Sequence, residues 1–272
     1  MERIDPVSKA APPAEATADP ARSRRIMDLV LAAGQLLLEI GAEVFRVEQT
    51  MRFMADSFAL QDFHAYVLTN GLFASAMDGQ VAEVRNVPNH TVHLARVDAV
   101  NSLSRKIAAG LVTLEEAEEQ LKAAAAIPAP SDRGQRLACS LGACCFALLF
   151  GGTVLDSLVA AASGFLLSSY LVWCDRHHAH SIFRKMTGAA LVSVCCLIGS
   201  GLLGADANAA TIGTLMILTP GVAFTMGIRD FANSDYLSGS IRMMDALLVG
   251  GSIAGGAGLV MALYSLWIGG PV

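Results

Sequence analysis

Residues 137–155 read LACSLGACCFALLFGGTVL, and this stretch decides what kind of protein the sequence encodes. It contains no charged residue over the length that an α-helix needs to cross the hydrocarbon core of a bilayer. Comparable apolar stretches follow at 157–173, 183–203, 209–227 and 244–268. The sequence therefore predicts an α-helical polytopic membrane domain with five transmembrane helices over residues 137–272.

The rest of the chain has the opposite composition. Residues 1–136 contain 14 of the 19 Lys and Arg residues and 18 of the 24 Asp and Glu residues. The net charge of −5 is mild, and no basic stripe with interleaved aromatic residues indicates nucleic-acid binding. Function is therefore expected in transport, in signalling across a membrane, or in chemistry within the membrane.

The charged half divides into three parts. Residues 1–22 contain four prolines among many alanines and predict a disordered leader, without the apolar segment of a secretory signal. Residues 23–126 predict a small cytoplasmic α+β domain. Residues 127–136, which begin with the sequence IPAP, predict a linker to the membrane domain.

One long helix is expected to open the α+β domain. Apolar residues recur at alternating steps of three and four, which predicts a continuous helix over 23–58. Strand patterns at 62–68, 71–77 and 80–87, with a turn at Asp78-Gly79, predict a minimal sheet. Two helices should follow, one ending at Gly110 and one opening with a capping box from Thr113 to Glu116.

A candidate polar site lies within the long predicted helix. In a continuous helix, the spacing places Glu39, Glu43 and Arg46 on one face. Gly41 would then lie in mid-helix, at a cost of about 1 kcal/mol relative to Ala, which favours close approach of a backbone or ligand. Solvated ion pairs are the alternative. The candidate cytoplasmic polar site consists of Gly41, Glu43, Arg46 and Glu48.

The positive residues of the membrane half predict its orientation. Lys and Arg occur before the first predicted span, between the second and third, and between the fourth and fifth, but not in the alternate connections. The positive-inside rule therefore places the N-terminus in the cytoplasm and the C-terminus outside. Abundant glycine in this half predicts close helix packing and suggests an oligomer.

A break in the fourth predicted span, at Thr219-Pro220-Gly221, and a cluster of charged residues beyond it mark a second candidate site. Proline removes a backbone donor, and a broken helix can expose groups that line a substrate cavity, although a plain packing kink is an equal alternative. Beyond the break, opposite charges that can neutralise one another gather at a membrane edge. A cytoplasmic loop with ordinary ion pairs is the alternative for these charges. The predicted substrate pathway consists of Thr219, Pro220, Gly221, Arg229, Asp230, Arg242 and Asp245.

Other signatures are weaker or absent from the sequence. Asp156, at the outer junction of the first two predicted spans, is a weaker candidate of the same kind. The sequence has no phosphate loop, no H-E-x-x-H and no G-x-S-x-G motif, so neither an ATP-driven pump nor a known class of hydrolase is indicated. No metal and no cofactor are predicted.

Several segments of the charged half resemble a known family. The sequence EIGAEVFRVE at 39–48, the hairpin that follows, the helix around Asn101 and the sequence LVTLEEA at 111–117 occur in that order. They are similar to the N-terminal signature of the threonine/serine exporter family, in its YjjP-like branch.

The membrane half resembles the same family. The sequences FGG at 150–152 and TPG at 219–221, and the charged segment from Arg229 to Arg242, fit its pattern. The resemblance implies export of small polar metabolites through the inner membrane, either threonine and serine or dicarboxylates such as succinate. It also implies a YjjB-like membrane subunit as partner, with this chain as one half of the pair. Since no ATP site is evident in the sequence, an ion gradient or facilitated flow is expected to drive export.

The resemblance and the residues together give a mechanistic hypothesis. The broken fourth span would line the path, Arg229 or Arg242 would attract a substrate carboxylate, and Asp230 or Asp245 would balance charge or carry a coupling proton. Two rivals remain. The soluble domain could be a membrane-anchored hydrolase with a glutamate of the polar site as base, or the chain could be a non-transporting sensing or assembly subunit.

Overall fold

A computed structural model describes residues 20–77, 79, 81–87, 92–177 and 179–268 of the chain. The chain divides at Ile127 into two units, residues 1–127 and 128–272. The predicted leader lies outside the described residues up to residue 19, and so does Asp78 of the predicted turn.

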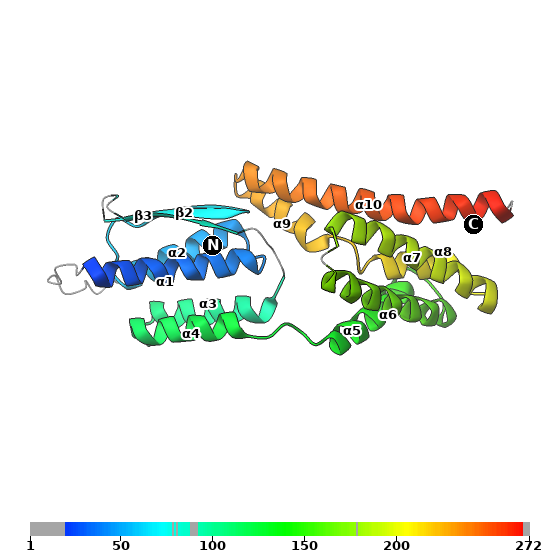
Figure 1. The fold of residues 1–272 in the computed structure, drawn as a ribbon, viewed down its shortest axis with the longest axis horizontal. Helices are drawn as coiled ribbons and strands as arrows, with labels where there is room; N and C mark the ends of the chain where they lie inside the picture. Colours follow the sequence, from blue (N-terminus) through cyan, green and yellow to red (C-terminus); the bar gives the residue numbers. More distant parts are fainter. Residues whose placement is uncertain (1–19, 78, 80, 88–91, 178, 269–272) are drawn as a thin grey trace, which may run out of the picture. The chain divides into compact units, whose positions relative to one another are not determined.

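Three layers build the first unit (Figure 1). The middle layer contains α1 (Pro20–Glu39) and α2 (Val44–Ser57). An antiparallel sheet covers one side, with β1 (His64–Leu68), β2 (Gly71–Ala76) and β3 (Val81–Asn86) in the order β1-β2-β3. The other side is covered by α3 (Leu94–Ala108) and α4 (Leu114–Ala126). The predicted strands and the last two predicted helices are therefore confirmed.

The prediction of one helix over 23–58 is wrong, because the chain turns at Gly41. Gly41 has a φ of +77°. Its N–H donates to the carbonyl of Leu38 at 3.0 Å, and the N–H of Ala42 donates to the carbonyl of Leu37 at 2.9 Å. This is the Schellman arrangement that ends helices at a left-handed glycine. The apolar period continues across the turn because α1 and α2 bury their stripes in the same core.

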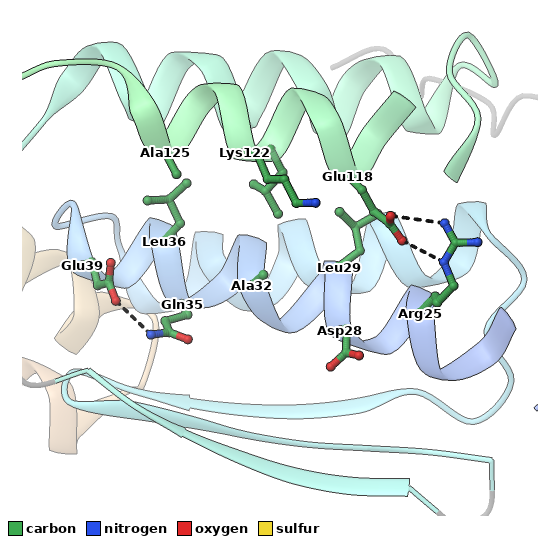
Figure 2. A pocket seen from close by; sticks show the side chains of 11 residues that line it. Arg25, Asp28, Leu29, Ala32, Gln35, Leu36, Glu39, Glu118, Lys122 and Ala125 are labelled. Carbon is green, nitrogen blue, oxygen red and sulfur yellow. Dashed lines mark hydrogen bonds and ion pairs between the residues drawn. The ribbon is translucent and has the colours of Figure 1, made fainter. Parts of the chain in front are cut away.

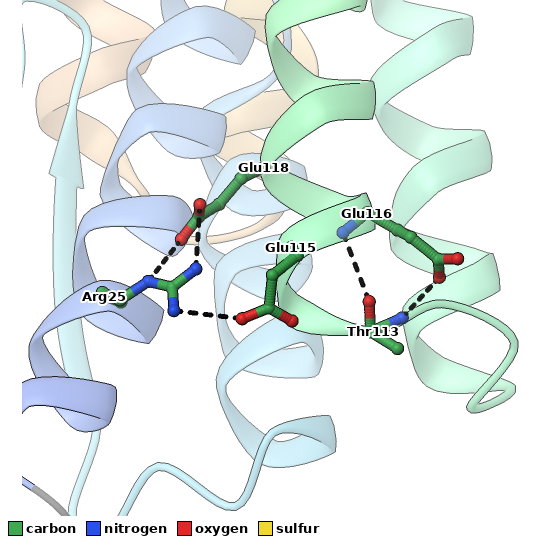
Figure 3. Close-up of polar contacts among 5 residues, drawn as sticks. All are labelled: Arg25, Thr113, Glu115, Glu116 and Glu118. Carbon is green, nitrogen blue, oxygen red and sulfur yellow. Dashed lines mark hydrogen bonds and ion pairs between the residues drawn. The ribbon is translucent and has the colours of Figure 1, made fainter.

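Long aliphatic and methionine side chains fill the core of this unit. The largest of those that are fully buried are Met27, Leu31, Leu37, Ile40, Met51, Met54 and Leu72. The predicted capping box is confirmed, since Thr113 Oγ1 accepts from the N–H of Glu116 at 3.3 Å while Glu116 Oε2 accepts from the N–H of Thr113 at 2.8 Å (Figure 3). Gly110, with a φ of +66°, follows α3 as predicted.

Six helices make up the described part of the second unit. They are α5 (Asp132–Leu149), α6 (Val154–Arg176), α7 (Ser181–Leu203), α8 (Ala207–Leu215), α9 (Gly221–Ala232) and α10 (Tyr236–Ile268). Helix α5 packs against α6 and α8, and α7 packs against α6, α8 and α10. Helix α10 also packs against α9, to which it is joined by a short turn (Figure 1).

Three helices are long and apolar enough to cross a membrane, within the residues that the structure describes. They are α6, α7 and α10, which correspond to three of the five predicted spans. The span predicted at 137–155 falls on the 18-residue α5, whose first five residues include Asp132, Arg133 and Arg136. The span predicted at 209–227 is divided between α8 and α9. For these two segments, membrane crossing stays a prediction.

Small residues bring the helices of the second unit close together. A Cβ added to Gly213 of α8 would lie 2.5 Å from the backbone nitrogen of Ala147 in α5, and one added to Gly164 of α6 would lie 2.8 Å from the carbonyl oxygen of Cys139. Such contacts leave no room for a side chain. The predicted close packing is therefore present, and specific glycines set it.

Candidate functional site

The predicted break in the fourth span is confirmed. Helix α8 ends at Leu215, the next residues form a turn, and α9 begins at Gly221 directly after Pro220. Thr219 Oγ1 donates to the carbonyl of Leu215 at 3.2 Å, and the N–H of Gly221 donates to the carbonyl of Thr219 at 2.9 Å. The break therefore has a defined, hydrogen-bonded geometry. Its role in lining a substrate path stays a prediction.

Helices α9 and α10 form a tight hairpin beyond this break. Asp235 caps α10, because its Oδ1 accepts from the N–H of Ser238 at 3.1 Å. A Cβ on Gly239 would lie 2.9 Å from the ring of Phe231, and one on Gly227 would lie 3.4 Å from the carbonyl oxygen of Gly239. The two glycines thus permit the close approach that places charged residues of both helices together.

A buried ion pair joins the two helices of this hairpin. Asp230 of α9 is 1% exposed, and its Oδ2 lies 3.1 Å from Nε of Arg242 in α10. The Arg242 side chain is itself 15% exposed, and its Nη1 lies 3.3 Å from the sulfur of Met226. A buried charge is tolerated only when it is paired, so each residue depends on the other.

The structure brings together some of the predicted pathway residues and not others. Sequence proximity suggested Asp245 as the partner of Arg242, whereas the structure pairs Arg242 with Asp230 across the hairpin. Arg229 and Asp245 are exposed on the surface of this unit. Asp245 lies within electrostatic reach of Lys185 on α7. The buried centre of the predicted pathway is therefore the pair Asp230 and Arg242.

Sequence reasoning missed the hydroxyl of Ser238 as a feature of this site. Ser238 is fully buried, and its Oγ has no hydrogen-bond partner among the described residues. It lies one helical turn before Arg242 on α10, which is the spacing that places two side chains on one face. Its sequence position next to a glycine at a helix start gave no signal of this burial.

Asp156 has a structural role at the opposite end of the unit. Its Oδ2 accepts from the N–H and hydroxyl of Thr153 at 2.6 and 2.8 Å, and its Oδ1 accepts from the N–H of Asp206 at 2.6 Å. Asp206 in turn caps α8 by accepting from the N–H of Asn208 at 2.8 Å. The buried Asp156 carboxylate therefore ties the start of α6 to the start of α8.

The predicted cytoplasmic polar site does not form as one helical face, because of the turn at Gly41. Glu43 is the N-cap position of α2, and Arg46 Nε lies 3.6 Å from its Oε2. Glu48 instead pairs with Arg52 at 3.0 Å. Gly41, Glu43, Arg46 and Glu48 are therefore split between a helix end and two separate pairs on α2.

A groove between α1 and α4 is a feature that the sequence did not predict. It has a volume of about 420 Å³. Figure 2 shows Glu118, Lys122 and Ala125 of α4 pointing toward Leu29 and Leu36 of α1. Apolar side chains thus line the groove, and charged groups lie along it, which is a combination typical of small-molecule sites. The two helices lie far apart in the sequence, so no local pattern could reveal it.

A three-residue ion cluster closes one end of this groove. The Arg25 guanidinium donates to Glu118 at 3.1 Å through Nε and to Glu115 at 3.0 Å through Nη1 (Figure 3). The hydrogen bond to Glu118, followed by that to Glu115, raises the pKa of Arg25. The pKa of Glu115 is lowered by a hydrogen bond from its own backbone N–H and then by the bond from Arg25.

The chemistry available to the molecule follows from these contacts. The described residues contain no group of three or more His, Cys, Asp or Glu side chains that could hold a metal ion. The pair of Asp230 and Arg242 places one carboxylate and one guanidinium in contact, largely shielded from solvent. A guanidinium recognises carboxylates through charge-assisted hydrogen bonds.

Comparison with known proteins identifies relatives over most of the chain. Residues 28–264 match the model of the threonine/serine exporter family, ThrE. A protein of Mycobacterium tuberculosis (strain ATCC 25618 / H37Rv) named "Probable threonine/serine exporter" is 22% identical over 243 residues. The alignment covers 88% of this chain but only 46% of that relative, so the chain spans about half of its length. No solved structure matches the chain.

Proposed function

The chain belongs to the threonine/serine exporter family, and from this premise we propose that it is a membrane subunit that exports small polar metabolites from the cytoplasm. The observation that carries the proposal is the buried pair of Asp230 and Arg242, 3.1 Å apart, beside a broken helix. An ionisable pair among apolar helices is costly to maintain and commonly belongs to a solute or ion path. Threonine, serine and dicarboxylates such as succinate all carry the carboxylate that an arginine recognises.

The pair suggests how such a subunit would work. In the closed state, Asp230 neutralises Arg242 between α9 and α10. A substrate carboxylate that enters beside the break at Thr219, Pro220 and Gly221 would compete with Asp230 for the guanidinium. Asp230 would then balance charge or take up a coupling proton, and Arg229 and Asp245 would form the exposed approach.

We further propose five membrane crossings in the bacterial inner membrane, with a cytoplasmic N-terminus and an external C-terminus. Three apolar helices of spanning length support the membrane location. The distribution of Lys and Arg supports the orientation. Helix α5 would make one of the remaining crossings, and α8 with α9 would make the other as a broken span.

A second membrane subunit completes this proposal. The chain spans about half of the length of its relative. We propose a YjjB-like subunit as its partner, assembled with this chain into an oligomer. The glycines of α10 that have open space around them, such as Gly251 and Gly255, offer a surface for close helix contact.

The groove between α1 and α4 favours a second candidate function. A soluble unit with a 420 Å³ groove could bind a small regulatory ligand, as a sensing subunit would. Reconstituted complexes that bind a metabolite without moving it would favour this function over export.

Efflux of labelled threonine, serine and succinate tests the proposal. Cells would express the chain with and without a YjjB-like partner, and the same cells would express Arg242→Gln or Asp245→Asn at equal membrane abundance. We expect partner-dependent efflux of one substrate, loss of efflux with Arg242→Gln, and a smaller loss with the exposed Asp245→Asn. Absence of efflux for all three substrates, with both proteins in the membrane, would contradict the proposal.

A further inference from the structure

One buried hydroxyl of the second unit differs from its neighbours. Ser169 Oγ donates to the carbonyl of Phe165 at 2.9 Å, and Ser193 Oγ donates to the carbonyl of Ala189 at 3.1 Å, so these hydroxyls satisfy themselves within their own helices. Ser168 is fully buried, and its Oγ has no hydrogen-bond partner among the described residues. An unpaired buried hydroxyl costs free energy and calls for a partner.

An arginine on the neighbouring helix has the same deficit. Nε of Arg136, on α5, is buried and has no partner in the part of the chain that the structure describes. A guanidinium stays protonated in proteins, so its donors cannot be relieved by losing a proton. Arg133, one turn earlier on α5, is exposed to solvent and has no such need.

Two contacts between α5 and α6 bracket these two residues along the helix pair. On one side, a Cβ on Gly164 would lie 2.8 Å from the carbonyl oxygen of Cys139. On the other side, Arg176 Nη2 lies 2.6 Å from Oδ2 of Asp132. Ser168 is one turn beyond Gly164 on α6, and Arg136 lies between the two α5 contacts. Both residues therefore belong to the facing stripes of an antiparallel helix pair.

We propose that Arg136 and Ser168 form a binding site for a carboxylate or phosphate oxygen at this end of the α5–α6 pair. A guanidinium N–H and a hydroxyl are donors that together suit an oxyanion, which would satisfy both groups at once. The positive-inside distribution assigns this end to the cytoplasm, where a solute to be exported would enter. The site is separate from Asp230 and Arg242, which lie on α9 and α10.

Two sources can supply the oxyanion. One is the carboxylate of the transported solute, an assignment that rests on the proposed function. The other is the phosphate of a lipid headgroup, which requires no transport. Full burial of Ser168 favours an oxygen that enters between the helices over one that stays at the lipid-facing surface.

Binding to the purified full chain in an uncharged detergent separates these sources. The probes are labelled L-threonine, L-serine and succinate, together with L-threoninamide, which lacks the carboxylate, and phosphatidylglycerol detected by native mass spectrometry. The variants are Arg136→Gln and Ser168→Ala. Arg133→Gln and Ser169→Ala are matched controls, since each changes the same residue type nearby without an unpaired buried group.

We expect Arg136→Gln to weaken binding of the carboxylate probe by about tenfold or more, in line with the loss of a charge-assisted hydrogen bond. Ser168→Ala should weaken it less, and threoninamide binding should not respond to either change. Loss of bound phosphatidylglycerol in Arg136→Gln, with solute binding intact, would instead identify the oxyanion as lipid phosphate. Equal binding of every probe by the variants and controls would overturn the site.

These outcomes also separate the inference from the proposed function. A wild-type chain that binds and exports a solute, with no change in Arg136→Gln for solute or lipid, contradicts the site and leaves export standing. A wild-type chain that exports none of the three solutes contradicts the proposed function. In that case, the phosphatidylglycerol measurement alone decides whether the site exists.

Discussion

The two units of this protein bury different kinds of side chain. The first unit buries leucine, isoleucine and methionine, and its charged residues lie at the surface. The second unit buries alanine, serine and threonine together with the ion pair of Asp230 and Arg242, while leucine and phenylalanine cover much of its outside. The first pattern is that of a protein in water, and the second is that of helices surrounded by lipid.

This difference indicates which interactions stabilise each unit. For a protein in water, the removal of apolar surface from solvent drives folding, so large apolar side chains in the core contribute most to the stability of the folded state. Between helices in lipid that drive is absent, and close contact through small residues and polar pairs takes its place.

Breaking the buried ion pair should have the largest effect. Asp230→Ala removes the carboxylate that neutralises Arg242, and we expect a loss of about 3–5 kcal/mol, seen as a strongly lowered thermal midpoint of the purified full chain. The double variant Asp230→Ala with Arg242→Leu should regain most of that stability without regaining export. A double variant as unstable as the single one would show that the pair does not act as a unit.

Removing a large side chain should affect the first unit almost as strongly. Leu72 of β2 is fully buried, and Leu72→Ala should cost about 2–5 kcal/mol through lost burial and the cavity left behind. Hydrogen exchange of the α1 and α2 amides in the full chain measures this loss. Val84 of β3 is 66% exposed, so Val84→Ala is the control and should leave the exchange unchanged.

Adding a side chain should destabilise the second unit at one glycine and not at another. Gly213→Val would force a Cβ to within 2.5 Å of the Ala147 backbone, and overpacking of this kind costs about 1–3 kcal/mol. Gly251 has open space around it, so Gly251→Val should leave the thermal midpoint unchanged. If both variants behaved alike, close glycine contact would not be what stabilises this unit.

The contrast between the units also explains what the sequence could predict. Apolar periodicity identified the helices and strands of the first unit. It did not reveal the turn at Gly41, because α1 and α2 bury their apolar faces in one core and the apolar period therefore continues across the turn. Residues close in sequence suggested partners for Arg242, whereas its partner across the hairpin depends on how closely α9 and α10 pack. No local sequence pattern could predict that Arg25 pairs with Glu118, which lies 93 residues away in the sequence.

Among the predicted changes, the effect of acidic pH on the first unit should be the smallest. The lowered pKa of Glu115 means that its contacts stabilise the folded state fully above the usual Glu value of 4.5. This contribution is lost as the pH falls below 4.5 and the carboxylate becomes protonated. Exposed ion pairs contribute little, so the shift in thermal midpoint should be slight.

A glutamine variant isolates this pH effect. Glu115→Gln cannot titrate, so its thermal midpoint should fall less steeply than that of the wild type as the pH is lowered from 6 to below 4.5. Glu119→Gln, on an exposed position of the same helix, should keep the wild-type slope. Equal slopes for all three proteins would mean that the cluster around Arg25 does not fasten α4 to α1.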